Sequence, residues 1–267
     1  MDFIKQIFDD SDDVGSRPGK RLSIALDQPN AGDQASAQMP RIELNLPHLR
    51  RHRIVAHQKS DRLTGSFDML RTRLLREMEM RDWKTIAITS PTAASGKTLT
   101  AINLAFSISH STTNTAVLAD FDLRRPSVAN YLGLPSDLRS VIEYFENTVR
   151  VRDVEVSLGV PNFVVVPNFF PVENAAETLA SDAAENLIMD LRDQYSDGIV
   201  VIDLPPLLEV DDALSVLPKV DCVLLVVAAG QSTANQIKEC RRLLKPYNLI
   251  GTVLNKSDSK SNQYDYY

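Results

Sequence analysis

Residues 85–109 read TIAITSPTAASGKTLTAINLAFSIS, and they carry the clearest indication of the fold class. It opens with TIAIT, an apolar run with the length of a buried strand, and it closes with LTAINLAFSIS, a helical pattern. The triplet Gly96-Lys97-Thr98 lies at the turn between them. Backbone N–H groups at such a turn, together with the dipole of the following helix, attract phosphate. The stretch therefore predicts a phosphate-binding P-loop.

Each residue of the triplet has a chemical reason to be there. Gly96 allows close approach of the backbone, Lys97 is expected to reach the β- and γ-phosphates, and the Thr98 hydroxyl is expected to ligate Mg²⁺. The strict pattern GxxxxGK[ST] is not met, because Pro91 stands where the first glycine belongs. The position between a strand and a helix still favours a loop that binds ATP and Mg²⁺. The nucleotide contacts are assigned to Ala93, Ala94, Ser95, Gly96, Lys97, Thr98 and Leu99.

Short apolar runs alternate with helical patterns through the rest of this region. Strands are predicted at 85–89, 116–120, 163–167, 198–203, 222–227 and 249–255. Helices are predicted at 67–80, 97–110, 127–145 with a break, 174–195, 211–217 and 232–245. Strands that are apolar on both faces and separated by helices indicate a mostly parallel sheet covered on both sides. The predicted fold class is a doubly wound α/β layer.

Three carboxylates come at the ends of predicted strands. Asp120 and Asp122 follow the second strand in VLADFDLRRP, and Asp203 ends the fourth in IVVIDLPP. Ligands of parallel α/β sheets bind at the carboxyl edge of the strands. A single aspartate at a strand end is usually a cap or turn residue, but three at one edge with a P-loop favour a Mg²⁺ and nucleotide site. Thr98, Asp120 and Asp203 are the predicted metal residues.

Composition excludes several other classes of protein. The net charge of −6 and the pI near 5.3 argue against a general nucleic-acid binder. The two cysteines, Cys222 and Cys240, have no spacing typical of a zinc site or a disulfide framework. No segment approaches the ~18–20 apolar residues that span a bilayer. The chain is therefore expected in the cytoplasm, where a partner would recruit it to the inner face of the plasma membrane.

The chain divides into three parts by composition. Residues 1–58 are predicted to be a disordered arm or linker, 59–255 the nucleotide-binding domain, and 256–267 a flexible tail. The basic cluster HLRRHR, residues 48–53, has two interpretations within the arm: a solvated linker, or a contact for an acidic lipid surface or partner. Three tyrosines, Tyr264, Tyr266 and Tyr267, stand among the last four residues.

The motifs together resemble a known family. SPTAASGKT, LADFDLRRPSVANYLGL, IVVIDLPPLLEVDDALSVLPKVDCVLLVV and GTVLNKSD are similar to the cytoplasmic kinase domain of the bacterial tyrosine kinases of capsule and exopolysaccharide export. The resemblance covers about residues 62–267, and DFDLRRP discriminates best. Wider relatives are the Min/Par-type ATPases, whose second P-loop lysine is replaced here by Thr92, Ala93 and Ala94.

The resemblance implies a role for each matching residue. Lys97 would contact the phosphates, while Asp120 and Asp122 would organise Mg²⁺ and the incoming tyrosine hydroxyl, with the general base left open between them. Asp203 would hold Mg²⁺ through water, and Asn255 would lie near the adenine. Arg124 or Arg125 would touch phosphate or a neighbouring subunit.

The resemblance also implies partners. They are a membrane chain-length regulator as activator, further copies of the chain in a ring or lower oligomer, and a cognate tyrosine phosphatase. The helix before the P-loop departs from the family's ExxRxxR pattern for ring assembly. Gly65 stands in place of the glutamate and Asp68 in place of the first arginine, and only Arg71 matches.

The expected function is autophosphorylation of Tyr264, Tyr266 and Tyr267, which would regulate polysaccharide polymerisation and export. Twelve residues beyond Asn255 reach at most about 40 Å, which exceeds a subunit radius of about 18 Å and suits transfer between neighbours. Two alternatives stay open from the sequence. One is a nucleotide-switched ATPase of the Min/Par type without kinase activity, and the other is an adaptor that binds nucleotide for structure.

Overall fold

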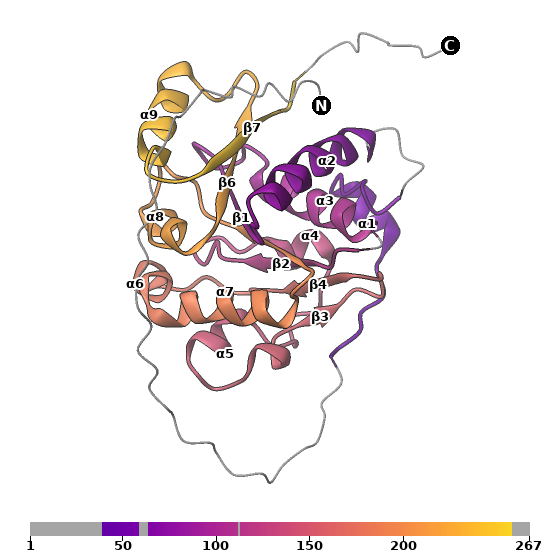
Figure 1. Cartoon of the computed structure of the whole chain (residues 1–267). Coiled ribbons are helices and arrows are strands. Elements are labelled where there is room, and N and C mark those ends of the chain that lie inside the picture. Colours follow the sequence, from indigo (N-terminus) through magenta and orange to yellow (C-terminus); the bar gives the residue numbers. More distant parts are fainter. Residues whose placement is uncertain (1–38, 59–63, 112, 258–267) are drawn as a thin grey trace, which may run out of the picture.

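The described part of the chain is built on one sheet. The computed structural model describes residues 39–58, 64–111 and 113–257, and these form a seven-stranded sheet in the order β3-β4-β2-β5-β1-β6-β7 (Figure 1). All neighbouring strands pair in parallel except β3, which is antiparallel to β4. The strands are β1 (Thr85–Thr89), β2 (Ala116–Asp120), β3 (Val156–Ser157), β4 (Phe163–Val166), β5 (Ile199–Asp203), β6 (Cys222–Ala228) and β7 (Leu249–Asn255).

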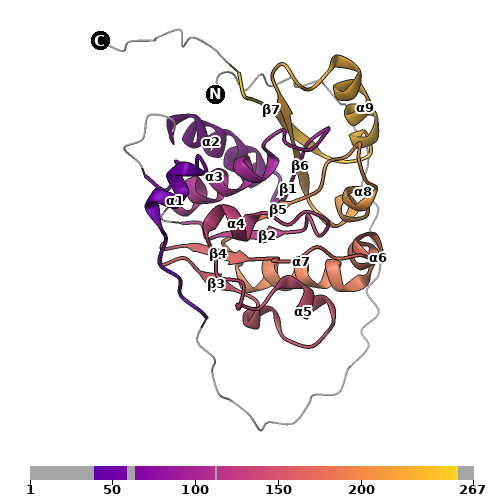
Figure 2. The ribbon, with the colours of Figure 1, turned by 180° about the vertical axis from the view of Figure 1, so that it is seen from behind.

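Helices cover both faces of the sheet (Figures 1 and 2). The first face packs against α1 (Leu46–Arg51), α2 (Thr64–Met80), α3 (Lys97–Ser109) and α4 (Val128–Leu132). The second face packs against α5 (Val141–Phe145), α6 (Ala175–Ala180), α7 (Asp182–Gln194), α8 (Asp212–Val216) and α9 (Ala234–Leu244). Two 3₁₀ turns, η1 (Val151–Asp153) and η2 (Leu217–Lys219), lie in the connections.

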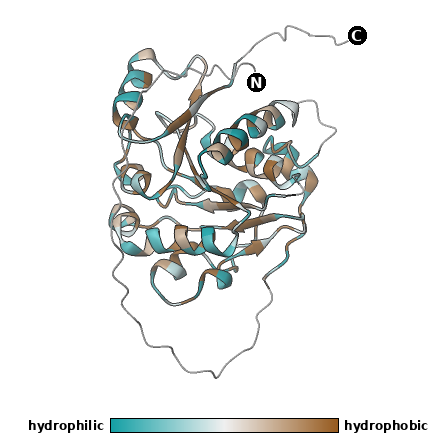
Figure 3. Cartoon of the chain, viewed as in Figure 1, coloured by the Kyte–Doolittle hydropathy of each residue, from teal (hydrophilic) through white to brown (hydrophobic). Residues whose placement is uncertain are grey.

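Each strand supplies side chains to two separate cores. In β1, Ile86 and Ile88 belong to the core under α2 and α3, whereas Ala87 belongs to the core under α7 and α9. Successive side chains of a strand point to opposite faces, so a strand buried on both sides must be apolar throughout. Figure 3 shows this as strands that are hydrophobic along their length, while the helices carry hydrophilic outer faces. The predicted doubly wound α/β fold is confirmed.

The predicted strands all form, with ends within about a residue of the expected positions. The helical pattern at 127–145 resolves into α4 and α5, and the pattern at 174–195 into α6 and α7. The sequence did not predict β3, because two residues cannot display a period. Among the described residues, no helix is both long enough and apolar enough to cross a bilayer.

The prediction that the disordered arm extends to residue 58 is wrong for residues 39–58. This segment forms α1, and Leu49, Ile54 and Ala56 are buried in the first core. Arg41 also makes a β-bridge to Ser157 of β3. The segment shows no sustained period in the sequence, and the core that its apolar residues complete comes from residues far along the chain. Residues 1–38 lie outside the described residues.

One buried amide ties this segment to the P-loop helix. The Oδ1 atom of Asn103, on α3, accepts hydrogen bonds from the backbone N–H groups of Val55 at 2.8 Å and Ala56 at 2.9 Å. Its Nδ2 atom donates to the carbonyl oxygens of Leu99 at 2.9 Å and Arg53 at 3.3 Å. Asn103 is completely buried, so water cannot replace these partners.

We expect Asn103→Ala to lower the free energy of unfolding by about 2–4 kcal/mol, because two buried N–H groups lose their acceptor. Urea denaturation measures the loss, and faster amide exchange at Val55 and Ala56 localises it. Asn235→Ala, at an exposed position of α9, is the matched control and should change little. Equal stability of the two variants would contradict the role given to Asn103.

The departures from the ExxRxxR pattern form an internal contact. Arg71 of α2 lies 3.1 Å from Asp68 and donates to the Ser107 carbonyl oxygen at 2.8 Å. The Ser107 hydroxyl donates to Asp68 at 2.6 Å. The acidic residue that replaces an arginine therefore links α2 to α3 within one chain. This occupies Arg71, the one residue that matches the family's assembly motif.

Candidate active site

The P-loop connects β1 to α3 and leaves the amino end of α3 uncapped. Ala94 and Gly96 take left-handed backbone conformations, with φ of 58° and 92°. Thr89 is the last residue of β1, before the loop. Its hydroxyl donates to the Pro205 carbonyl oxygen at 2.7 Å. No side chain caps α3 at its N-cap residue, Gly96. Its first backbone N–H groups therefore stay available to an anion.

Gly96 is required by space as well as by backbone conformation. A Cβ atom at this position would lie 2.0 Å from Nδ2 of Asn255, at the end of β7. That Nδ2 atom donates to the carbonyl oxygen of Ser95 at 3.0 Å. Asn255 therefore supports the P-loop through Ser95, and its side chain is almost completely buried. Its contact with adenine stays a prediction.

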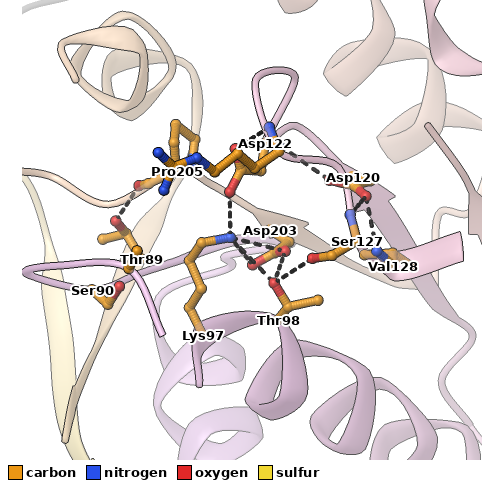
Figure 4. Close-up of polar contacts among 12 residues, drawn as sticks. Thr89, Ser90, Lys97, Thr98, Asp120, Asp122, Ser127, Val128, Asp203 and Pro205 are labelled. Atoms are coloured by element: carbon orange, nitrogen blue, oxygen red, sulfur yellow. Dashed lines mark hydrogen bonds and ion pairs between the residues drawn. The ribbon is translucent and has the colours of Figure 1, made fainter. Parts of the chain in front are cut away.

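Lys97 lies between two of the three predicted carboxylates (Figure 4). Its Nζ atom is 2.8 Å from Asp122 and 3.3 Å from Asp203. The Thr98 hydroxyl donates to Asp203 at 2.5 Å. Asp203 ends β5 and Asp120 ends β2, and the two are register neighbours in the sheet. The sheet edge thus brings the P-loop and all three aspartates together, as the sequence predicts.

Burial and mutual repulsion set the protonation of these groups. Asp120 is completely buried, and desolvation, followed by the nearby charge of Asp203, raises its pKa to about 8. Desolvation also raises the pKa of Asp203, although the Lys97 ammonium partly opposes the shift. Burial alone would lower the pKa of Lys97, but the attraction of Asp203 and Asp122 outweighs it and raises that pKa. Below about pH 8, Asp120 therefore keeps its proton while Lys97 stays charged.

Asp120 orders the loop that follows β2. Its Oδ2 atom accepts from the backbone N–H groups of Ser127 and Val128, both at 3.0 Å. Its Oδ1 atom accepts from the backbone N–H of Asp122 at 3.2 Å. The Ser127 hydroxyl then donates to the Thr98 hydroxyl at 3.2 Å. Asp120 therefore fixes the turn that carries Asp122 and closes onto Thr98.

A cavity of about 700 Å³ opens above the P-loop, within the range of ~300–1,000 Å³ of ligand pockets. Asp122 lines it, whereas Asp120, Asp203, Ser95 and Asn255 lie outside its lining. The predicted nucleotide residues that do line it are Ala93, Ala94, Gly96, Lys97, Thr98 and Leu99. The predicted acceptors Tyr264, Tyr266 and Tyr267 lie outside the described residues.

Two ion pairs form one rim of the cavity. Arg124 makes a two-pronged contact with Asp212 of α8, at 2.7 and 3.0 Å. Arg125 lies 3.7 Å from Glu209, whose other oxygen accepts from the backbone N–H of Ala93 at 2.5 Å. Glu209 thus connects this rim to the P-loop. The sequence did not assign it a site role, because glutamate before a helix is ordinarily a helix-start residue.

A further part of the cavity lining comes from the segment that the sequence analysis assigns to the arm. Arg51, His52 and Arg53 line the cavity together with Tyr131 of α4. The basic cluster HLRRHR was visible in the sequence, but neither of its two interpretations placed it at the nucleotide site. Its location follows from contacts of high sequence separation, such as those of Asn103, which a local pattern does not reveal.

Comparison with known proteins gives a consistent result. No protein-family model matches the chain. Tyrosine-protein kinase CpsD of Streptococcus pneumoniae serotype 4 is 30% identical over 183 residues, which cover 68% of this chain and 79% of that protein. The kinase domain of Escherichia coli tyrosine kinase ETK superposes with a TM-score of 0.72 and 27% identity, covering 85% of this chain and 93% of that domain.

The fold is shared more widely. The septum site-determining protein MinD of Pyrococcus horikoshii, solved with Mg-ADP, has a TM-score of 0.56 and 19% identity, over 66% of this chain and 72% of that one. At this identity the likeness shows the fold alone. It agrees with the predicted α/β fold class.

Proposed function

This chain belongs to the bacterial tyrosine-protein kinases, and on that premise we propose that it transfers the γ-phosphoryl group of ATP to Tyr264, Tyr266 and Tyr267 of a neighbouring copy. The observation that carries the proposal is the contact between Lys97 and Asp122 on the cavity wall. A cation for the phosphates and a carboxylate for the acceptor proton lie side by side there. Through this reaction the chain would regulate capsule or exopolysaccharide polymerisation and export.

The residues present fit Mg-ATP. The uncapped start of α3 presents backbone N–H groups to phosphate. The raised pKa values of Asp120 and Asp203 mean that added positive charge next to them is stabilising. Among the described residues, no three His, Cys, Asp or Glu side chains form a group that holds a metal by itself. Mg²⁺ in nucleotide sites is ordinarily completed by phosphate oxygens and water.

Each residue then has a chemical task. When bound, Mg-ATP supplies the phosphoryl group, with part of its charge neutralised. Lys97 would contact the phosphates, and Thr98 and Asp203 would hold Mg²⁺ or its waters. Asp122 is the proposed proton acceptor, because it alone of the three aspartates lines the cavity. A tyrosine hydroxyl, with an ordinary pKa of about 10, needs such a carboxylate as it attacks.

Purified protein incubated with Mg-ATP tests the proposal through its phosphotyrosine content. We expect the triple variant Tyr264→Phe, Tyr266→Phe, Tyr267→Phe to lose at least nine-tenths of the signal, because phenylalanine has no hydroxyl to accept phosphate. Nucleotide affinity should stay within twofold of the wild type. Tyr247→Phe, a half-buried tyrosine near the end of α9, is the matched control. An unchanged signal in the triple variant would move the acceptor elsewhere.

The proposed partners rest on the family resemblance. We propose a membrane chain-length regulator as the activator and the inner face of the plasma membrane as the working place of the chain. Self-association would be weaker than in a stable ring, because Asp68 and Ser107 engage Arg71 within one chain. Sedimentation with and without the cytoplasmic segment of a candidate regulator tests both points. A stable ring of the isolated chain would contradict the second.

A further inference from the structure

One wall of the active-site cavity is formed by residues that the proposed chemistry of the site does not use. We call Arg51, His52, Arg53 and Tyr131 the basic wall, since they line the cavity together. Arg51 ends α1, His52 and Arg53 directly follow it, and Tyr131 belongs to α4, which packs against both α1 and α3 (Figure 2). The basic wall therefore comes from two segments on either side of the P-loop in the sequence.

The wall is held in place by specific contacts at its base. His48 lies 2.8 Å from the Asn130 carbonyl oxygen through Nε2, which joins α1 to α4. The His52 ring contacts the His48 carbonyl oxygen at 3.0 Å through Nδ1 and meets the Tyr131 ring edge-on at 5.5 Å between centroids. Arg53 takes a left-handed conformation, with φ of 59°, and its carbonyl oxygen is bound by Asn103. The wall is thus a built surface.

The charges of the wall lack partners. The guanidinium groups of Arg51 and Arg53 are exposed and, within the described residues, make no hydrogen bond or ion pair. The guanidinium of Arg50, one residue away, is bonded to Gln58 at 2.9 Å and does not line the cavity. Two unpaired arginines that face a cavity favour an anion there, since arginine is suited to bind phosphate.

The position along α3 identifies which part of the nucleotide meets the wall. Lys97 and Asp122 mark the β- and γ-phosphate end of the cavity. The amide of Asn103 bonds both the Leu99 and Arg53 carbonyl oxygens, so Arg53 lies beside α3 beyond Leu99. Backbone groups at the start of a P-loop helix bind the α- and β-phosphates. Arg53 therefore lies past the phosphate-binding start of α3, a position that favours the nucleoside end of the cavity.

We propose that the basic wall binds the nucleoside half of the nucleotide. Arg51 and Arg53 pair with the α-phosphate, and the base rests against the His52–Tyr131 pair. This inference rests on the proposed function, because it takes Mg-ATP as the ligand. It gives the segment before the sheet a direct part in nucleotide binding; Lys256, which follows β7, lines the same cavity.

The affinity of Mg-ADP, measured by calorimetry on the full chain, tests the charged part of the wall. We expect the double variant Arg51→Ala, Arg53→Ala to bind Mg-ADP at least tenfold more weakly than the wild type, with a reduced dependence on salt. Arg50→Ala on the same helix is the matched control and should stay within twofold. Unfolding temperatures of both variants should match the wild type, since these guanidinium groups are exposed.

The aromatic part needs a second ligand. Tyr131→Leu should weaken Mg-ADP about fivefold and leave inorganic tripolyphosphate unchanged, because only the nucleotide carries a base to stack. An equal loss for both ligands would mean that the variant damages the P-loop, and it would overturn the assignment. The assignment would also be overturned if the double arginine variant bound Mg-ADP like the wild type but required a higher concentration of acceptor peptide for phosphorylation.

The two proposals fail separately. Wild-type protein that binds Mg-ADP but forms no phosphotyrosine would contradict the proposed function. The Mg-ADP affinities of the variants would still decide whether the basic wall binds the nucleotide. Normal phosphotyrosine formation with unaltered affinity in the arginine variant would contradict only the wall. Wild-type protein without affinity for Mg-ADP would overturn both.

Discussion

Lys97→Met is expected to reduce autophosphorylation by about 10²–10³-fold, the loss that follows when one preorganised charge-stabilising group is removed from an active site. The reason is geometric. The Lys97 ammonium lies at the P-loop 2.8 Å from Asp122, so it is positioned for the transferred phosphoryl group and the proposed base together. Methionine keeps the length of the side chain but supplies no charge. Phosphotyrosine formed per minute at saturating Mg-ATP measures the effect.

The same change should also alter stability, and this identifies the cause. Asp122 and Asp203 lose their only lysine partner among the described residues, and an unpaired buried charge destabilises a fold. We expect a lower unfolding temperature for Lys97→Met than for the wild type, measured on nucleotide-free protein at one pH. Lys245→Met, at an exposed position after α9, is the control. Autophosphorylation above one tenth of the wild-type rate would contradict the role of Lys97.

The second large effect is on the pH dependence of stability. The pKa of Asp120 is about 8 in the folded protein, against an ordinary value of 3.8. Between about pH 4 and pH 8, Asp120 therefore keeps its proton in the folded state, whereas it has lost that proton in the unfolded state. Stability must fall as the pH rises from about 4 to about 8, by up to ~1.4 kcal/mol per pH unit for one proton. Above pH 8 the full cost is present, and below pH 4 it disappears.

Asp120→Asn removes the titrating group but keeps an oxygen that accepts the Ser127 and Val128 backbone bonds. We expect the variant to have a flatter dependence than the wild type and to be the more stable of the two at pH 8. A residual slope from Asp203 will remain, because the pKa of that group is also raised. Urea denaturation of nucleotide-free protein at several pH values measures both slopes. Asp193→Asn, on the exposed side of α7, should leave the wild-type slope unchanged.

The sequence predicts the sheet and the centre of the site because both depend on local patterns. Apolar runs such as TIAIT fit only a strand buried on two faces, and an aspartate at a strand end must appear at the carboxyl edge of a parallel sheet. These rules place Asp120, Asp122 and Asp203 beside Lys97 without any knowledge of distant contacts. The structure confirms this arrangement.

The parts that were missed depend on contacts between distant residues. The segment 39–58 shows no sustained period in isolation, and Asn103, which lies 48 positions beyond Val55, binds its backbone. Glu209 reaches the P-loop backbone at Ala93 across 116 positions. A pattern within ten or twenty residues carries no information about such pairs. The sequence shows the arginines of the basic wall as a cluster. It does not show that they line the cavity, because that position also depends on distant contacts.

The bond between Asn255 and Ser95 spans 160 positions and has a consequence for how the protein folds. A loop of this length closes at a large entropic cost, so the contact is expected to form late, when β7 joins β6. Nucleotide should then be unable to assist the early steps of folding, since its binding loop is still unsupported. A fragment that contains the glycine-lysine-threonine triplet but ends before β7 would carry the motif without the affinity. Nucleotide binding thus reports that β7 has joined the sheet. During refolding, the fluorescence signal of a bound nucleotide should recover later than the helical content.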